Sequence, residues 1–203
     1  YSRIDEYLLS IGFKRRLSES TLYVKLEIHN LIIVSVYVDD LLITGSNSEI
    51  IKEFREQMQG EFEMTDLGEM AYFLGMEIQQ TKKGVFIGQK KYANEILKKF
   101  KMGECKAMDT PLALNEKLCS ETDALTANES LYRSIVGCLM YLTATRPDIV
   151  FTVNLLSRFL NCAKEVHLKA AKRVLRYIKG TTDYGISFMK TEKLDLHGYA
   201  DSD

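Results

Sequence analysis

Short apolar stretches of the length of β-strands, bounded by polar turn residues, occupy much of residues 1–88. Two stretches of this region have helical spacing instead: 1–13, which ends near Gly12, and 47–58, which follows cap-forming residues. The remaining pattern predicts strands over 20–28, 31–38, 41–45, 72–80 and 84–89. Short polar segments separate these strands, so we expect antiparallel hairpins with turns at 29–30, 39–40 and 81–84.

From residue 89 the spacing of apolar residues becomes mainly helical. The stretch 103–125 has no clear period and contains Pro111, so we expect a linker or extended loop there. Thr126 and Thr145 each precede an acidic residue by three positions, which predicts capping boxes at two helix starts. The pattern predicts helices over 89–100, 131–142, 148–160 and 164–180, then strands of a new sheet over 184–188 and 194–200. The sequence therefore predicts an α+β fold.

Two adjacent carboxylates interrupt the most apolar part of the chain. Asp39 and Asp40 stand between the predicted strands 31–38 and 41–45. Like charges at contact distance repel each other, and burial of either one is costly. Aspartate is a common turn residue, so the pair could simply form a solvent-exposed turn. Alternatively, two carboxylates on a rigid hairpin tip bind a divalent cation, which supplies the neutralising charge.

Composition and net charge narrow the classes of function. The formal net charge is -1, so any surface that attracts nucleic acid must be local. The four cysteines form no C-x-x-C pair and histidine is scarce, which argues against a zinc site and favours reduced thiols inside a cell. No signal peptide or membrane-spanning run is present, and we expect a cytoplasmic or nuclear protein, with an organelle also open. The chain opens at Tyr1 and its first methionine is Met58, so we expect a piece of a longer protein.

Two predicted helices carry basic residues on one face. In 164–179 the apolar residues fall on one arc, and in 90–101 they again line one face. Such a face is usually solvated surface, but on 164–179 only Glu165 interrupts the positive charge, and this bias favours contact with phosphates. His167 lies within the apolar arc, where a buried, hydrogen-bonded histidine is expected. The basic residues are Lys90, Lys91, Lys98, Lys99 and Lys101 on the first helix, and Lys169, Lys172, Arg173, Arg176 and Lys179 on the second.

Several segments together carry a family resemblance. In chain order they are YVDDLLITG (37–45), FLGMEI (73–78), TPLALNEKL (110–118), YRSIVGCLMYLTATRPDI (132–149), AAKRVLRYIKGT (170–181) and GYADSD (198–203). This series resembles the reverse transcriptase of copia-type long-terminal-repeat retrotransposons, within the pol polyprotein. The resemblance implies RNA-directed DNA polymerase activity, with template-directed phosphodiester formation by two-metal phosphoryl transfer. An unrelated α+β domain is the weaker alternative, because the motifs keep their order.

The resemblance also implies a domain order. Residues 1–88 would be the second half of a palm with an antiparallel sheet, 89–180 a helical thumb and connection, and 181–203 the first strands of a ribonuclease H-like sheet. The implied partners are an RNA or DNA template–primer duplex, deoxynucleoside triphosphates and the remaining polyprotein segments. No membrane is implied.

Site residues follow from the same resemblance. Asp39 and Asp40 would be catalytic ligands of magnesium, with two ions in the intact enzyme. Asp201 would belong to a partial ribonuclease H site. Tyr37 and Val38 would lie under the primer terminus, and Phe73, Leu74 and Gly75 would belong to the hairpin that holds the primer end. The nucleic-acid backbone would contact Lys90, Lys91, Lys98, Lys99, Lys169, Lys172, Arg173 and Arg176.

The resemblance further implies that parts of the enzyme lie outside this chain. The family has a third catalytic aspartate, a nucleotide-binding segment and fingers, all of which we expect before Tyr1. The isolated chain is therefore expected to be inactive. The alternative from another class is a non-enzymatic, nucleic-acid-binding relic of a decayed element.

Overall fold

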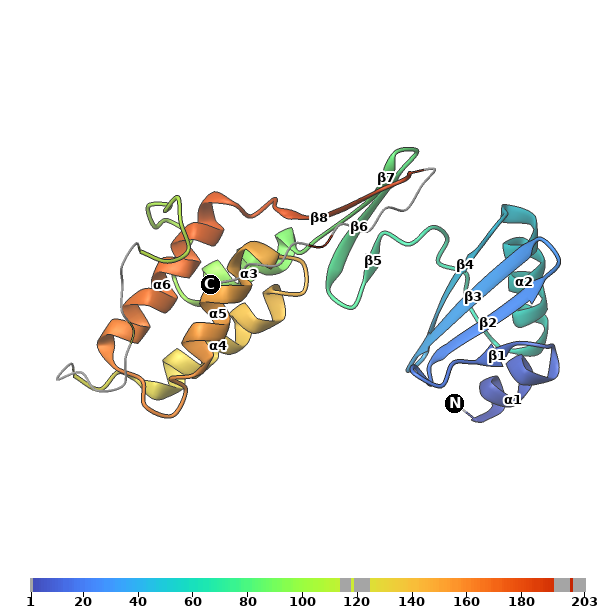
Figure 1. Cartoon of the computed structure of the whole chain (residues 1–203), viewed down its shortest axis with the longest axis horizontal. Coiled ribbons are helices and arrows are strands. Elements are labelled where there is room, and N and C mark those ends of the chain that lie inside the picture. The colour runs from blue at the N-terminus through green and yellow to red at the C-terminus, as the bar shows by residue number, and fades with distance from the viewer. Residues whose placement is uncertain (1, 114–117, 119–124, 192–197, 199–203) are drawn as a thin grey trace. The chain divides into compact units, whose positions relative to one another are not determined.

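A computed structural model describes residues 2–113, 118, 125–191 and 198 of the chain (Figure 1). The chain divides into two compact units, Tyr1–Gly68 and Glu69–Asp203. Each unit combines helices with a four-stranded antiparallel sheet, which confirms the α+β class. No helix in these ranges has both the length and the apolar character needed to cross a membrane.

The first unit is a sheet backed by two helices. Its strands lie in the order β1-β2-β3-β4. Adjacent strands are joined by short connections, and every pair is antiparallel. The elements are α1 (Ser2–Ser10), β1 (Lys14–Arg15), β2 (Leu22–Glu27), β3 (Asn30–Tyr37), β4 (Asp40–Gly45) and α2 (Ser48–Glu61).

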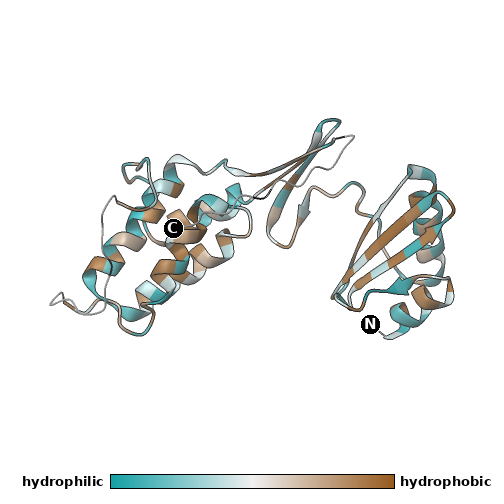
Figure 2. Cartoon of the chain, viewed as in Figure 1, coloured by the Kyte–Doolittle hydropathy of each residue, from teal (hydrophilic) through white to brown (hydrophobic). Residues whose placement is uncertain are grey.

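The core of this unit lies between the sheet and the helices. Leu8 of α1 and Phe54 and Met58 of α2 share one core with buried residues of the strands. In β3 the alternate residues Ile32, Val34 and Val36 are buried, and those between them are half-buried. The apolar run of β3 is thus fully covered on one face only, and the apolar colouring of the strands is visible in Figure 2. Asn47 caps α2, since its side chain accepts a hydrogen bond from the backbone N–H of Ile50.

The second unit joins a sheet to a helical bundle. The sheet has the order β5-β6-β7-β8 and is antiparallel throughout. Helices α3 to α6 pack around one core, to which buried residues of all of them contribute. The elements are β5 (Tyr72–Phe73), β6 (Met76–Thr81), β7 (Gly84–Gly88), α3 (Lys90–Lys99), α4 (Glu129–Leu142), α5 (Pro147–Ser157), α6 (Glu165–Gly180) and β8 (Gly185–Met189).

The second sheet corrects two expectations. The strand over 185–189 does not open a separate sheet, because it pairs along its whole length with β7. The sheet therefore runs across the expected boundaries at 88 and 180, and a ribonuclease H-like sheet is not confirmed. The second strand expected there, 194–200, lies almost wholly outside the described residues. The single strand expected over 72–80 is in fact two, β5 and β6, with a turn between them.

Neither predicted capping box forms. Helix α4 begins after Asn128, whose side chain accepts a hydrogen bond from the N–H of Leu131. Helix α5 begins with Pro147, and its cap residue Arg146 makes no side-chain capping bond. The carboxylate of Asp148 is engaged by Arg146 instead. Spacing alone could not distinguish a capping acid from one held by a neighbouring arginine.

Candidate functional site

The β3–β4 hairpin carries the paired aspartates at its tip, although the turn lies one residue earlier than the predicted 39–40. Tyr37 pairs with Asp40, so the turn itself consists of Val38 and Asp39. Val38 has a φ of 53°, which is uncommon for a β-branched residue, and its side chain is 74% exposed. A strained residue persists where the surrounding structure enforces it, and such residues gather at functional sites.

Both aspartates are exposed to solvent. The exposure avoids the desolvation cost that two buried carboxylates would carry. The strands beneath the tip are well anchored, because Val36, two residues before the turn, is buried in the core. The arrangement therefore presents hard oxygen donors on a rigid support, which suits magnesium. In the ranges described, no group of three or more His, Cys, Asp or Glu side chains could hold a metal ion, so Asp39 and Asp40 could by themselves offer only part of a coordination shell.

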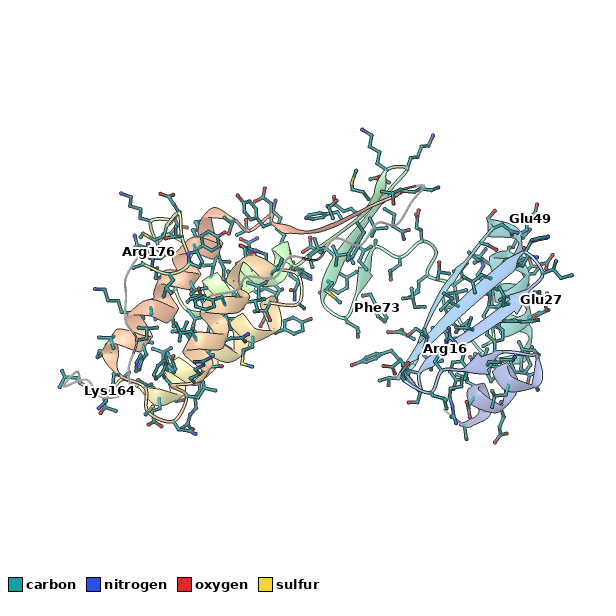
Figure 3. All side chains as sticks on the ribbon, viewed as in Figure 1. Arg16, Glu27, Glu49, Phe73, Lys164 and Arg176 are labelled. Atoms are coloured by element: carbon teal, nitrogen blue, oxygen red, sulfur yellow. The ribbon has the colours of Figure 1, made fainter. Side chains whose placement is uncertain are left out.

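A second tight turn lies in the other unit, between β5 and β6. Phe73 pairs with Met76, which leaves Leu74 and Gly75 as the two turn residues. Their φ values are 49° and 78°, the combination of a type I′ hairpin turn. Phe73 is half-buried and is labelled in Figure 3. The residues expected to hold a primer end thus form one compact turn.

The lysines of α3 are all on the surface. Lys90, Lys91, Lys98 and Lys99 are exposed, while Ala93, Ile96 and Leu97 face the core. Lys99 lies over the ring of Phe100, with its ammonium nitrogen 5.3 Å from the ring centroid. The amphipathic helix predicted here is confirmed, and its basic face is open to a polyanion.

The four basic residues expected on α6 differ in their surroundings. Lys169 and Lys172 are exposed. Arg173 and Arg176 are half-buried and bind the segment that follows α3. The guanidinium of Arg173 donates to Thr110 Oγ1 at 2.9 Å, and that of Arg176 donates to the backbone carbonyl of Lys106 at 2.7 Å. Arg176 is labelled in Figure 3. Only the two lysines are therefore wholly available to a ligand.

His167 is buried, as expected from its place on the apolar arc. Its Nδ1 accepts a hydrogen bond from the backbone N–H of Lys164 at 3.0 Å, which caps the first turn of α6. Its ring stacks on Phe159, with a centroid separation of 4.0 Å. These contacts give the histidine a place in the core of the bundle.

Sequence reasoning did not foresee the burial of Arg146. Its side chain is 2% exposed, and it forms a bidentate ion pair with Asp148 at 2.9 and 2.6 Å. It also donates to the carbonyl and the hydroxyl of Thr181, at the end of α6. Its guanidinium carbon lies 5.6 Å from the ring centroid of Tyr177 and 5.3 Å from that of Tyr184. The arginine thus ties the start of α5 to the end of α6 and the approach to β8.

The pKa of Asp148 reports the same ion pair. Partial burial on its own raises the pKa of this carboxyl. The hydrogen bonds from Arg146 and Tyr177 and the charge of Arg146 outweigh burial and hold the pKa below its ordinary value of 3.8. Burial and the adjacent carboxylate raise the pKa of Tyr177, whose hydroxyl donates to Asp148 at 2.9 Å.

Comparison with known proteins identifies the family. The model of the family "Reverse transcriptase (RNA-dependent DNA polymerase)" matches residues 1–114. The chain belongs to this reverse transcriptase family. The resemblance seen in the motifs is thereby confirmed, since its relatives include Pol polyproteins of transposons.

Several relatives of this reverse transcriptase chain match it over most or all of its length. The retrovirus-related Pol polyprotein from transposon RE1 of Arabidopsis thaliana is 37% identical over the whole chain. That from transposon TNT 1-94 of Nicotiana tabacum is 35% identical, again over the whole chain. The chain spans only 14% and 16% of these two polyproteins. An uncharacterized mitochondrial protein of Arabidopsis thaliana is 42% identical over 83% of the chain, which covers 70% of that protein. No solved structure matches.

The family match covers some of the expected site residues and not others. The matched residues include both tight turns, with Asp39 and Asp40 on one and Leu74 and Gly75 on the other. Helices α4, α5 and α6 lie after the family match, in a part of the sequence that the transposon polyproteins also match. Asp201 lies outside the described residues.

Proposed function

We propose that this chain supplies the metal-binding and primer-holding parts of an RNA-directed DNA polymerase encoded by a retrotransposon. The observation that carries the proposal is the exposed Asp39–Asp40 pair on a rigid hairpin tip, within a chain of the reverse transcriptase family. Residues 1–88 would act as the second half of a palm and 89–180 as thumb and connection. Residues 181–203, whose strand β8 pairs with β7, would lead into the start of a ribonuclease H domain.

Magnesium fits the donors at the tip. Asp39 and Asp40 would hold it through carboxylate oxygens, and further ligands would come from the polyprotein region that precedes Tyr1. When bound, two magnesium ions would activate the attacking 3′-hydroxyl and neutralise charge on the leaving pyrophosphate. The carboxylates themselves need no change of conformation to reach a cation, because the tip is already exposed.

The primer and template would be held by the chain's other site residues. Tyr37 and Val38, on the same hairpin as the aspartates, would lie under the primer terminus. Phe73, Leu74 and Gly75 would hold the primer end. The exposed lysines of α3 and α6 would contact the phosphate backbone, which requires charge and no base reading. We also place the protein inside the cell, in the cytoplasm or nucleus, which the free thiols of Cys105, Cys138 and Cys162 support.

The alternative is a nucleic-acid-binding protein without polymerase activity. One observation favours this alternative. The chain covers 70% of an uncharacterized mitochondrial relative but only 14% of the Pol polyprotein from transposon RE1, so that relative is much shorter than a polyprotein. This alternative keeps the basic surface of α3 and α6 and gives the aspartates no chemical part. The two functions therefore differ in what happens when Asp39 is neutralised.

Primer extension on an RNA template separates these functions. The protein used is a longer polymerase that contains this chain and the polyprotein region preceding Tyr1. Asp39→Asn in it should reduce extension by at least about 1,000-fold, because phosphoryl transfer depends on metal placement and charge. Asp183→Asn makes the same change of charge at an exposed residue of the other unit and should leave extension unchanged. Full activity of Asp39→Asn would contradict the polymerase assignment.

A further inference from the structure

The Leu74–Gly75 turn is attached to helix α4 by one side chain. The hydroxyl of Tyr141 donates a short hydrogen bond to the carbonyl oxygen of Leu74, 67 residues earlier in the chain. Tyr141 lies in the last turn of α4 and is 42% exposed. An exposed tyrosine that reaches a carbonyl in a tight turn fixes that turn relative to its own helix.

Gly75 and Tyr141 fit each other closely. A Cβ atom added at Gly75 would clash with the Tyr141 hydroxyl oxygen. The φ of Gly75, 78°, also disfavours any other residue there. Glycine thus suits both the backbone conformation of the turn and the close approach of the tyrosine hydroxyl.

Helix α3 supports the same contact from the other side. The ring of Tyr92 meets that of Tyr141 edge-to-face, with centroids 4.8 Å apart. The hydroxyl of Tyr92 donates to the carbonyl of Cys138, one turn earlier on α4. The carboxylate of Glu77, on β6, accepts a hydrogen bond from the backbone N–H of Lys91 in the first turn of α3. The β5–β6 hairpin is therefore held by both helices.

From this arrangement we propose that Tyr141 is a positioning residue, which sets the place of the primer terminus by fixing the Leu74–Gly75 turn. This inference rests on the proposed polymerase function, in which that turn holds the primer end. Leu74, with a φ of 49°, has a backbone conformation that persists only where contacts enforce it, and the Tyr141 hydroxyl makes such a contact. Loss of the hydroxyl shifts the turn, and a misplacement of about 1 Å can reduce a rate by about 100-fold.

The test compares two tyrosines of the same helix. Tyr132 also lies on α4, and its hydroxyl donates to the carbonyl of Leu156 within the bundle. Tyr141→Phe and Tyr132→Phe therefore each remove one hydroxyl-to-carbonyl hydrogen bond, but only the first touches the hairpin. In the longer polymerase, we expect Tyr141→Phe to lower kcat about tenfold or more. The KM for the template–primer should stay within about twofold, since the basic surface that binds the duplex is unchanged. Tyr132→Phe should change neither constant.

A second comparison tests the contact itself. Gly75→Ala alone should reduce kcat strongly, because its new methyl group meets the tyrosine oxygen. In the Tyr141→Phe background the nearest remaining ring atom is 3.2 Å away, so the same change should cost several-fold less. Hydrogen exchange of the backbone amides over 72–81 in the 203-residue chain should accelerate in Tyr141→Phe and not in Tyr132→Phe.

Each outcome has one meaning. A selective fall of kcat in Tyr141→Phe, with faster exchange over 72–81, supports the inference. Equal kcat in Tyr141→Phe and the parent overturns it, even if exchange accelerates, because the contact would then be structural only. An equal loss in both tyrosine variants also overturns it. If the parent extends no primer, or Asp39→Asn extends normally, the proposed function fails and the inference fails with it, while the exchange experiment still reports the contact.

Discussion

Arg146 is the one Lys, Arg, Asp or Glu residue with a buried side chain in the described part of the chain. A buried guanidinium is tolerated because its donors are satisfied by Asp148 and Thr181. The sequence shows arginine, proline and aspartate side by side at 146–148, but it does not show that the arginine side chain is buried. Arginine is normally exposed, and the partner Thr181 lies 35 residues away.

At this scale we predict that Asp148→Asn lowers the free energy of unfolding by about 3 kcal/mol at pH 7, because it leaves a buried guanidinium without its counter-charge. The pKa of Asp148 is lowered in the folded protein, so the carboxylate stabilises the fold above its ordinary pKa of 3.8. That contribution is lost as the pH falls through the folded value. The gap between parent and variant should therefore be full at neutral pH, narrow below about pH 4 and close at still lower pH.

Urea denaturation of both proteins between pH 7 and pH 3 measures this gap. Glu129→Gln is the control, because it removes an acid from an exposed ion pair with Arg133 on α4. That change should cost less than about 1 kcal/mol at every pH. Equal losses for the two substitutions would show that the buried pair contributes no more than a surface pair.

At the scale of elements, the spacing of apolar residues correctly predicted most helices and the β3–β4 hairpin, because these depend on local sequence. The β3–β4 hairpin, the helix over 47–58 and the four later helices all form where the pattern places them, within a few residues. The break between β5 and β6 was missed, because Leu74 carries no local signal for a positive φ. The partner of β8 was also missed, since alternation shows that a strand forms and not which strand it joins.

Helix α6 gives the prediction at this scale. Replacing Lys169 and Lys172 with glutamine should weaken binding of the 203-residue chain to a nucleic-acid duplex regardless of base sequence. The slope of log affinity against log salt should fall by about 2, because each of the two lysines neutralises about one phosphate. The free energy of unfolding should stay unchanged, because both lysines are exposed and neither forms an ion pair in the described structure. Fluorescence anisotropy over a range of salt concentrations measures the affinity and its salt slope, and urea denaturation measures the free energy of unfolding.

The matched control removes two exposed lysines of the first unit, Lys14 and Lys52. Their replacement with glutamine should leave affinity and salt slope close to those of the parent. Equal effects of the two pairs would mean that α6 contributes only to the net charge. Replacement of Arg173 and Arg176 is less informative, since these residues also hold the segment at 106–110 through hydrogen bonds.

At the scale of the whole molecule, the family model matches residues 1–114 and some relatives match the entire chain. The two aspartates proposed as metal ligands are nevertheless too few to surround a magnesium ion. The proposed site residues fall in both compact units, with the aspartates in Tyr1–Gly68 and the Leu74–Gly75 turn and the basic helices in Glu69–Asp203. The sequence motifs predicted membership of the reverse transcriptase family, because each motif is a short continuous segment of the chain. The motifs could not predict a complete set of magnesium ligands. The described part of the chain brings no third carboxylate, histidine or cysteine close to Asp39 and Asp40.

The last prediction follows from that ligand count. Magnesium takes six oxygen ligands in a near-octahedral shell and gives up water reluctantly, so two carboxylates hold it weakly. Calorimetric titration of the isolated 203-residue chain should give a Kd on the order of 1 mM or weaker, and Asp39→Asn should weaken it further while Asp183→Asn does not. The isolated chain should extend no primer on an RNA template, whereas the longer polymerase should extend it under the same conditions. Extension by the isolated chain would show that its own residues complete the metal shell, and would overturn the partial-site interpretation of Asp39 and Asp40.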